Sequence, residues 1–430
     1  MRYKNIILGA LLAASFGARG DNNLKFSEIW AKIRVHAPEL QQKNQERQAA
    51  EAAAQAAKKH WLPRLSVGAQ ALNTDAPGNS LFLKLGQREI QAADFSPTEL
   101  NDPDRETYIM SGAQLDWALY EGGRGQKGSE AGGKMAEAAS QAEQAQSLFL
   151  YTTALRDYRD LTALYSQQAS LSEVEQLVNQ VLAKYQVGRK GNPVGYSGLL
   201  GLKGLRNRVV GLKQANGAES QGIKSNLSQK AGGLGDTWSP VAESVSSHSK
   251  GKDHVESSRV KAHQLQAQAL GFQAQAQKSR VLPYVGARVN YERIEGDRGA
   301  GDALSGGVFL QWEIYSSNSR GAYRQAYHQA QASEAEARKM QIEETIQFEQ
   351  VMSGLKATQE NLRLLEESSA LLKEQMQVSQ KLFLNGSMNA LQLTEVLSRR
   401  VDLLVDQTKA RRQLHQLEGA HFMLTGGQLP

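Results

Sequence analysis

The sequence contains no cysteine among its 430 residues. It therefore has no disulfides, no thiolate metal site and no cysteine that could carry a lipid anchor. The eight histidines are scattered, with no His-x-x-x-His pair and no flanking carboxylate cluster. Because metal sites need such spacings, and because no Gly-x-Ser-x-Gly elbow is present, we expect no metal site, no cofactor and no enzymatic activity.

Long apolar runs are also missing. No stretch after the first twenty residues holds ~18 consecutive apolar residues, so we expect no transmembrane helix. The net charge of +6 is mild for this length, and aromatic residues do not interleave with a basic cluster. A secreted nucleic-acid binder is therefore disfavoured.

The first twenty residues have the three parts of a secretory signal. Arg2 and Lys4 are basic, residues 6–16 form an apolar core, and Ala18-Arg19-Gly20 offers small residues before Asp21. We interpret residues 1–20 as a signal peptide, although an N-terminal core helix would share its apolar run. The exported chain is then expected to be soluble outside the cytoplasm, or to reach a membrane as β-structure.

A glycine-rich stretch, LDWALYEGGRGQKGSEAGGKM, resembles nucleotide-binding loops in its spacing. Gly123-x-Gly125-x-x-Gly128 fits a dinucleotide fingerprint, but the preceding strand alternates and no strand follows the next helix. A P-loop needs Ser or Thr after its lysine, and here Met135 follows Lys134. We therefore read Gly122, Gly123 and Gly125 as the residues that permit a sharp strand-to-helix turn.

Three motifs occur twice, in the same order in both halves of the sequence. The first places proline after an Ala/Gln-rich helical run, which favours an extended continuation. The pairs are Trp61–Ala69 with Val281–Ala287, Leu115–Tyr120 with Leu310–Tyr315, and Lys184–Gly188 with Lys381–Gly386. This order predicts a tandem duplication of a β–β–long-helix–helix unit, with repeats at 21–255 and 256–430.

The β-hairpins, expected over 64–118 and 284–315, alternate with a period of two. In the first, Leu65 and Val67 face one way while Ser66 and Gln70 face the other. One face is therefore apolar and the other is wet. Each run approaches the ~9–11 residues that a tilted strand needs to cross a bilayer. A soluble antiparallel sheet over a core would give the same alternation.

The helices are expected to be long. No proline interrupts the sequence between Gln126 and Tyr185, and an apolar stripe in this stretch includes Leu171, Val174 and Val178. In the second half, Phe348, Leu355 and Leu362 follow a heptad. This is coiled-coil packing, and a 60-residue helix is roughly 90 Å long. We predict long helical hairpins over 126–230 and 321–425, with a polar loop at 231–255 between the repeats.

In this order, the repeated motifs resemble the TolC-like outer membrane efflux protein family. The resemblance covers nearly the whole mature chain, and it rests on the order of individually loose motifs. They are Leu62-Pro63 and Leu282-Pro283, LDWALYEGGR and LQWEIYSSNSR, KYQVGRKG and KLFLNGSMNALQLTEVLSRR, and the ending AHFMLTGG. Two departures are the glycine-rich helix after residue 191 and the long strand connection from Asn73 to Arg105.

The resemblance implies a mainly α fold with a membrane β-barrel portion. Four strands per chain would combine in a homotrimer into a twelve-stranded barrel, continued by an α-helical barrel of long coiled-coil hairpins. It also implies a passive exit duct in the outer membrane of a Gram-negative bacterium, extending into the periplasm. The partners would be outer membrane lipid, a periplasmic adaptor (membrane fusion) protein and an inner membrane pump, in a tripartite efflux or type I secretion system.

Two groups of residues are candidate sites under this resemblance. The hairpin tips would dock the adaptor or line the periplasmic entrance: Gly188, Arg189, Lys190, Asn385, Gly386, Ser387 and Asn389. The aromatic girdle at the membrane–water interface would comprise Trp117, Tyr120, Trp312 and Tyr315. The simpler readings are solvated turn residues and ordinary core aromatics.

Other functions fit parts of the same pattern. A periplasmic coiled-coil scaffold or adaptor with a soluble sheet is the main alternative. A substrate-specific porin would need eight or more strands in one chain, and the sequence shows only four.

Overall fold

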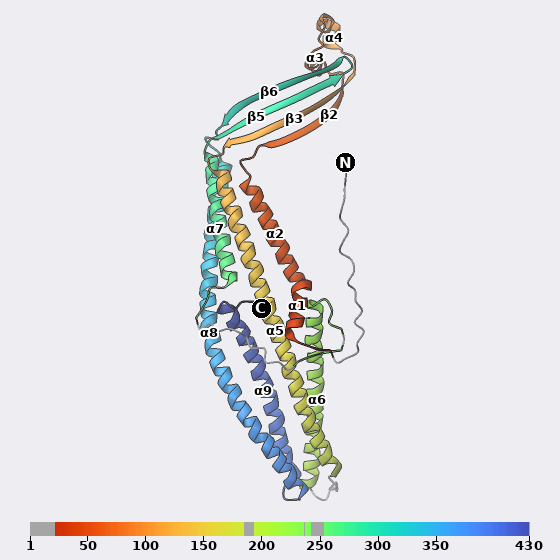
Figure 1. Ribbon diagram of the computed structural model, residues 1–430, viewed down its shortest axis with the longest axis vertical. Coiled ribbons are helices and arrows are strands. Elements are labelled where there is room, and N and C mark those ends of the chain that lie inside the picture. The colour runs from red at the N-terminus through yellow and green to blue at the C-terminus, as the bar shows by residue number, and fades with distance from the viewer. Residues whose placement is uncertain (1–21, 185–192, 236, 242–252, 430) are drawn as a thin grey trace. The chain divides into compact units, whose positions relative to one another are not determined.

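The computed structural model describes residues 22–184, 193–235, 237–241 and 253–429 (Figure 1). The expected signal peptide, residues 1–20, lies outside these residues. The chain divides into two compact units. The helical unit comprises Met1–Gln41, Gln146–Val255 and Thr345–Pro430, and the sheet unit comprises Gln42–Ala145 and Glu256–Glu344. Each unit therefore contains segments from both halves of the duplicated sequence.

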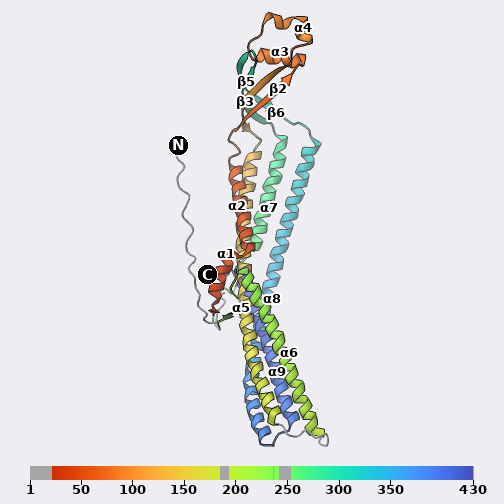
Figure 2. The same ribbon diagram turned by 90° about the vertical axis from the view of Figure 1, so that its right-hand side faces the viewer.

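A four-stranded antiparallel sheet, seen edge-on in Figure 2, is the central element of the sheet unit. Its strands are β2 (Arg64–Thr74), β3 (Glu106–Tyr120), β5 (Tyr284–Gly296) and β6 (Gly299–Gln311), in the order β2-β3-β5-β6. Pairing of β3 with β5 joins the hairpin of one repeat to that of the other. β2 and β6 are consequently the two edge strands, and neither has a second neighbour within the described chain.

The turn from β3 into the next helix uses the glycines that the sequence singled out. Gly122 and Gly123 have φ of 64° and 80°, in the left-handed region that glycine enters without a steric penalty. A Cβ on Gly125 would lie 2.1 Å from His60 Nδ1, so a larger residue there would have to displace the side chains of His60 and Glu121. The predicted turn role is confirmed for Gly122 and Gly123, whereas Gly125 lies within the helix α5 (Arg124–Lys184).

Besides the short helices of the β2–β3 connection, four longer helices run through the sheet unit. They are α2 (Pro38–Lys58), α5 (Arg124–Lys184), α7 (Ser258–Lys278) and α8 (Ser317–Leu384), of which α2, α5 and α8 also enter the helical unit. α2 packs closely on α5, because Gly132 leaves room for Ala54 and Arg47 forms an ion pair of 2.7 Å with Glu143. No helix in the described part of the chain is both long and apolar enough to cross a membrane.

The long β2–β3 connection is folded. It contains α3 (Pro77–Gly86), the 3-10 helix η1 (Ala92–Phe95) and α4 (Pro97–Asn101), and we call it the cap. The cap packs against the β5–β6 turn, because Gly301 has no Cβ to clash with the carbonyl oxygen of Gly86.

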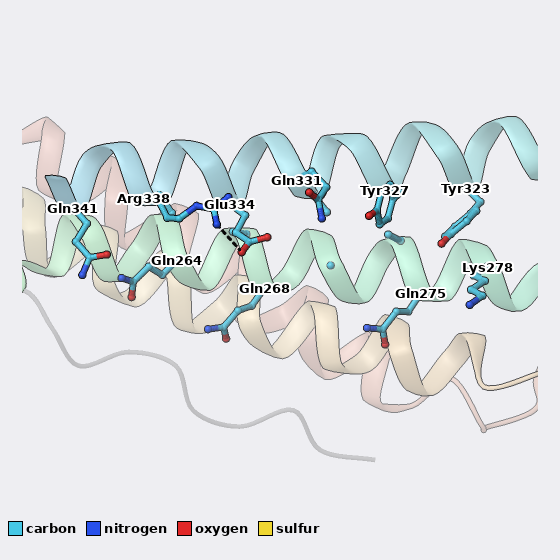
Figure 3. A pocket seen from close by; sticks show the side chains of 15 residues that line it. Gln264, Gln268, Gln275, Lys278, Tyr323, Tyr327, Gln331, Glu334, Arg338 and Gln341 are labelled. Atoms are coloured by element: carbon cyan, nitrogen blue, oxygen red, sulfur yellow. Dashed lines mark ion pairs between the residues drawn. The ribbon is translucent and has the colours of Figure 1, made fainter. Parts of the chain in front are cut away.

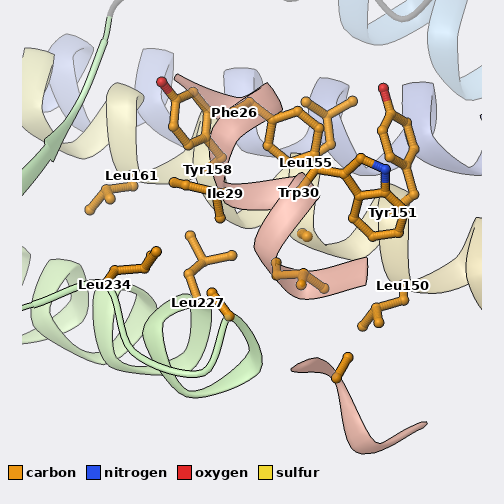
Figure 4. Close-up of a cluster of buried hydrophobic side chains, with 14 of the residues drawn as sticks. Phe26, Ile29, Trp30, Leu150, Tyr151, Leu155, Tyr158, Leu161, Leu227 and Leu234 are labelled. Carbon is orange, nitrogen blue, oxygen red and sulfur yellow. The ribbon is translucent and has the colours of Figure 1, made fainter. Parts of the chain in front are cut away.

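The helical unit contains α1 (Phe26–His36), α6 (Pro193–Lys230) and α9 (Ala390–Leu424), together with parts of α5 and α8. Its first core cluster brings α1 onto α5 (Figure 4). Trp30 meets Tyr151 edge-on, with ring centroids 5.1 Å apart. A second cluster, between α5, α6 and α9, buries Leu171, Val174 and Val178. The seam that the apolar periodicity predicts on α5 is confirmed.

The segment 231–255, expected to be a polar loop, contains a short strand. β4 (Trp238–Pro240) pairs in parallel with β1 (Asn22–Leu24). Trp238 is only 1% exposed, and the Tyr158 hydroxyl donates to the carbonyl oxygen of Leu24 and accepts from the Val241 amide, at 2.9 Å each. Burial of one tryptophan and these hydrogen bonds order a segment whose glycines disfavour a helix.

Candidate functional site

One face of the sheet is polar across all four strands. The strand register places Arg64, Asp116 and Arg288 in one row, where Asp116 accepts a 2.6 Å hydrogen bond from Arg288 Nε. The next row of this face carries only short polar or amide side chains: Ser66, Gln114, Asn290 and Ser305. Gly68 and Gly112 follow. In these rows the face offers hydrogen-bonding groups and small residues, as a water-facing surface requires, whereas Met110, Ile294 and Phe309 lie on the same face in other rows.

The opposite face of the sheet is apolar and uncovered. Leu65, Leu115 and Val289 form one row, and the neighbouring row contains Val67, Tyr291 and Leu304. Val67 is 79% exposed and Leu304 is 75% exposed. An exposed apolar area that spans several strands indicates contact with another molecule or with a membrane.

The four predicted girdle residues lie where the strands meet the helices. Trp117 Nε1 donates to the carbonyl oxygen of Trp61 at 2.8 Å. All four side chains are at least 42% exposed, so none is an ordinary core aromatic: Trp117, Tyr120, Trp312 and Tyr315. The guanidinium of Arg320 lies 4.9 Å from the ring centroid of Tyr315.

The predicted tip residues divide between described and undescribed parts of the chain. Gly188, Arg189 and Lys190 lie outside the described residues. The second tip is a tight turn between α8 and α9, in which Gly386 has φ 77° and its amide donates to the Phe383 carbonyl.

The other residues of this turn are exposed. Asn385 and Ser387 form the turn, and Asn389 caps α9 by accepting a 2.9 Å hydrogen bond from the Gln392 amide. The Gln392 side chain reciprocally accepts from the Asn389 amide at 3.2 Å. Asn389 therefore has a structural role, whatever else it contacts.

A groove of about 560 Å³ lies between α7 and α8 in the sheet unit (Figure 3). Ala267, Gly271 and Ala274 line it, together with glutamines and the tyrosines Tyr323 and Tyr327. Tyr327 is 45% exposed, and Arg338 pairs with Glu334 on the same helix at 3.6 Å. The groove has no convergent charge or nucleophile that would indicate chemistry.

The cap contains an ionic cluster that sequence reasoning missed. The buried ammonium of Lys84 lies 3.5 Å from a carboxylate oxygen of Glu99 and of Glu106, and 3.8 Å from one of Asp94. Arg298, from the β5–β6 turn, pairs with Asp94 at 2.8 Å. The sequence hints at this cluster only through one lysine, Lys84, inside the apolar run Leu81–Leu85. An amphipathic surface helix would also contain such a lysine, so the pattern does not predict burial.

Burial alone would raise the pKa of Asp94. The amide of Gln91 and the charges of Arg298 and Lys84 outweigh this effect and hold the pKa of that carboxyl below its ordinary value of 3.8. The cap is thus fastened to the β5–β6 turn by a carboxylate that stays ionised.

A family model described as "Outer membrane efflux protein" matches residues 30–214 and 255–426, which is most of the chain and a segment in each repeat. A search of curated proteins found no match.

Solved structures share the fold at low sequence identity. CusC, whose title concerns conformational changes that accompany folding and transmembrane channel formation, is 13% identical with a TM-score of 0.77, covering 97% of this chain and 96% of that chain. VceC, an outer membrane protein of Vibrio cholerae, is 14% identical with a TM-score of 0.74, covering 94% and 97%. The CmeC outer membrane channel of Campylobacter jejuni is 10% identical with a TM-score of 0.76, covering 99% and 94%. The predicted fold class is confirmed.

Proposed function

The chain belongs to the outer membrane efflux protein family, and from that premise we propose that it is the outer membrane exit duct of a tripartite efflux or type I secretion system. In this role it conducts cargo passively from the periplasm to the exterior. An inner membrane pump supplies the energy and a periplasmic adaptor links the pump to the duct. The chain itself performs no chemistry.

The observation that carries this proposal is the uncovered apolar face of the sheet. Val67, Leu304 and Val308 are 69–79% exposed, and in water each would cost free energy in proportion to its apolar area. Outer membrane lipid removes that cost, because strands of a membrane barrel alternate apolar residues outward with polar residues inward. The polar face then lines the conduit.

Closure of the barrel requires more than one chain. β2 and β6 each have an unpaired edge, and an open edge cannot lie in lipid, where its N–H and C=O groups would have no partner. A homotrimer that pairs β6 of one chain with β2 of the next satisfies both edges with twelve strands. We propose this trimer as the functional state.

In this trimer each of the two candidate sites has a defined position. The girdle of Trp117, Tyr120, Trp312 and Tyr315 sits at the periplasmic boundary of the lipid, because each residue lies where a strand meets a helix. In this proposal the tip residues 188–190 and 385–389, which follow α5 and α8 in the sequence, contact the adaptor. Opening of the entrance takes place there.

Cell fractionation followed by mass measurement of the detergent-extracted protein tests the proposal. We expect the protein in the outer membrane, extractable only with detergent, with a protein mass of three chains. A monomer or dimer released by salt alone would contradict the proposal and favour a periplasmic coiled-coil scaffold or adaptor, in which the apolar face is covered by another protein.

A further inference from the structure

The cap covers the polar face of the sheet at the strand ends farthest from the long helices. It connects the end of β2 to the start of β3, whereas the other ends of these two strands join α2 and α5 (Figure 1). Lys84 of α3 lies 3.5 Å from Glu106 on β3, and the Gln87 side chain lies against Gly296 on β5. The strand register places Glu106 and Gly296 on the same face as Asp116. The cap is therefore docked on the polar face.

Burial at these strand ends differs between the two faces of the sheet. On the polar face Tyr108 is fully buried and Thr74 is 9% exposed, whereas Ile109 on the apolar face is 51% exposed. The cap also accounts for an apolar residue on the polar face, because Ile294 lies under Gly86, where an added Cβ would be 2.6 Å from Ile294 Cδ1. The cap thus covers one side of the sheet and leaves the other side open.

In the proposed exit duct, the covered region is the external mouth of the conduit. The polar face lines the conduit there, and the long helices leave the sheet at its other end, toward the periplasm. An eight-stranded barrel is filled by its own side chains, and barrels of 16–18 strands leave an aqueous channel. Twelve strands enclose an intermediate width, so that a folded segment from each of three chains is enough to obstruct the mouth.

The side of the cap that points away from the sheet is apolar. Ser80 and Lys84 are buried on one side of α3, whereas Phe82 and Leu85 on its other side are 70% and 52% exposed. Phe95 of η1 is 59% exposed. In the trimer this side faces the axis of the conduit, as does the same side of the other two caps. Contact between the three caps therefore removes apolar surface from water.

The docked surface of the cap contains polar groups that lack partners. Gln87 is 1% exposed, and neither polar atom of its side-chain amide has a hydrogen-bond partner in the described chain. The Ser80 hydroxyl is equally buried and also without a partner there. Arg88 has φ 62°, and it is the only non-glycine residue with positive φ among those described. Water would satisfy these groups in an undocked cap, and backbone strain of this kind is common in switch regions.

We propose that the cap is a lid on the external mouth of the conduit. In the closed state the caps of three chains meet through Phe82, Leu85 and Phe95, while each cap stays docked on the polar face of its own sheet. The lid opens when the surface around Gln87 and Ser80 separates from the sheet. This inference rests on the proposed function and adds a control point at the end of the duct opposite the adaptor.

Labelling of single cysteines in intact cells tests the lid, because the natural chain contains no cysteine. Ser66→Cys places a thiol on the polar face, between the cap and the helices. A charged maleimide dye that is too large for general porins reaches this thiol only through the external mouth, so labelling should be slow. Asp104→Cys, at an exposed position just before β3, should be labelled rapidly.

Two independent changes should open the lid. Phe82→Ser with Phe95→Ser removes the apolar contact between caps and leaves the docked side unchanged. Lys84→Met removes the cation that faces three carboxylates of the cap and β3. Each should raise the labelling rate of Ser66→Cys about tenfold or more. Thr98→Ala, at an exposed polar position on α4, is the matched control and should leave the rate unchanged.

The contact between caps can be tested directly by cross-linking. A short bifunctional maleimide should join Phe82→Cys of two chains into covalent dimers on a denaturing gel, because each chain then carries one thiol near the axis of the trimer. Asp104→Cys is the matched control, since this exposed residue adjoins the start of β3 in the barrel wall. It should remain monomeric, and equal behaviour of the two variants would exclude the contact between caps.

The outcomes separate the lid from the exit duct. Labelling of Ser66→Cys as fast as that of Asp104→Cys, with the cap unchanged, would overturn the lid and leave the duct standing. Slow labelling that neither the serine pair nor Lys84→Met accelerates would also overturn the lid, because the cap would then not control access. Absence of labelling even at Asp104→Cys would overturn the proposed function itself, since the strand ends would not reach the exterior.

Discussion

The indole Nε1–H of Trp312 donates a 3.0 Å hydrogen bond to the carbonyl oxygen of Val281. Trp117 makes the same bond to Trp61, and in both repeats the acceptor precedes a Leu-Pro pair. The two halves of the chain thus share this tryptophan-to-carbonyl hydrogen bond as well as the order of their elements. In each repeat the bond ties the end of an outgoing strand to the segment that enters the neighbouring strand.

Loss of the Trp312 hydrogen bond should destabilise the connection between the end of β6 and the segment that enters β5. Trp312→Phe keeps an aromatic ring but removes the donor, and the expected cost is about 1 kcal/mol of unfolding free energy. Tyr315→Phe is a matched control, because the Tyr315 hydroxyl has no hydrogen bond within the described residues. Denaturant unfolding of the detergent-extracted protein measures both. Equal stability of the two variants would show that the indole bond contributes nothing.

The cap should depend on its buried lysine. Lys84→Met removes the cation from between Asp94, Glu99 and Glu106 and leaves their charges close together. Removing one partner of a buried ionic group costs about 3 kcal/mol or more, so the cap should open locally. Faster hydrogen exchange in residues 77–101, with unchanged exchange in α9, is the expected result. Lys409→Met, at an exposed position on α9, should have no effect.

Acid should open the cap in the same way. The pKa of Asp94 is below its ordinary value of 3.8 in the folded state, so this carboxylate stabilises the fold above that pH. The stabilisation is lost as the pH falls from about 4 through the lowered value, because protonation then removes the charge that faces Arg298 and Lys84. Glu99 and Glu106 face the same lysine. Hydrogen exchange of the cap at pH 7 and pH 3 should show this change, and Asp94→Asn should exchange fast at both.

Much of the fold was predictable because its strands, helices and turns follow from residue patterns between close neighbours in the sequence. The alternation around Leu65 and Val67 and the seam through Leu171 and Val178 follow directly from apolar spacing. Gly122 and Gly123 could be assigned to a turn because the glycine motif lacked the elements that a nucleotide fold needs. Local patterns of this kind are visible in the sequence before any tertiary contact is known.

Long-range contacts were not predictable. The strand at Trp238 depends on Tyr158 and on a partner strand more than 200 residues away, so the local sequence read as a loop. The Lys84 cluster combines carboxylates from a helix, a 3-10 helix and a strand. Propensity and periodicity carry no information about such pairings.

The two faces of β6 should respond oppositely to a charge. Leu304 and Ser305 are neighbours whose side chains lie on the apolar and the polar face respectively. Leu304→Arg should destabilise membrane insertion by about 2–4 kcal/mol if it lies near the bilayer centre, and Ser305→Arg should be tolerated because it faces water. The yield of folded protein in the outer membrane measures both. Equal yields would mean that the apolar face does not contact lipid.

We expect the tip between α8 and α9 to affect efflux without affecting assembly of the trimer. Gly386 is exposed, has φ 77° and would meet no atom within 4 Å with an added Cβ. Gly386→Val should therefore distort only the turn, since a β-branched residue is strained at positive φ. We expect loss of efflux, measured as increased dye accumulation in cells, with normal amounts of outer membrane trimer.

The neighbouring position separates backbone geometry from side-chain size. Ser387 is also exposed, but its φ is not in the left-handed region. Ser387→Val therefore adds the same bulk without the strain and should leave efflux close to normal if the shape of the turn is what matters. Equal loss in both variants would instead indicate that the tip surface itself contacts the adaptor. Normal efflux in Gly386→Val would exclude this turn from the entrance, because the only glycine-dependent geometry of the described tip would then be dispensable for transport.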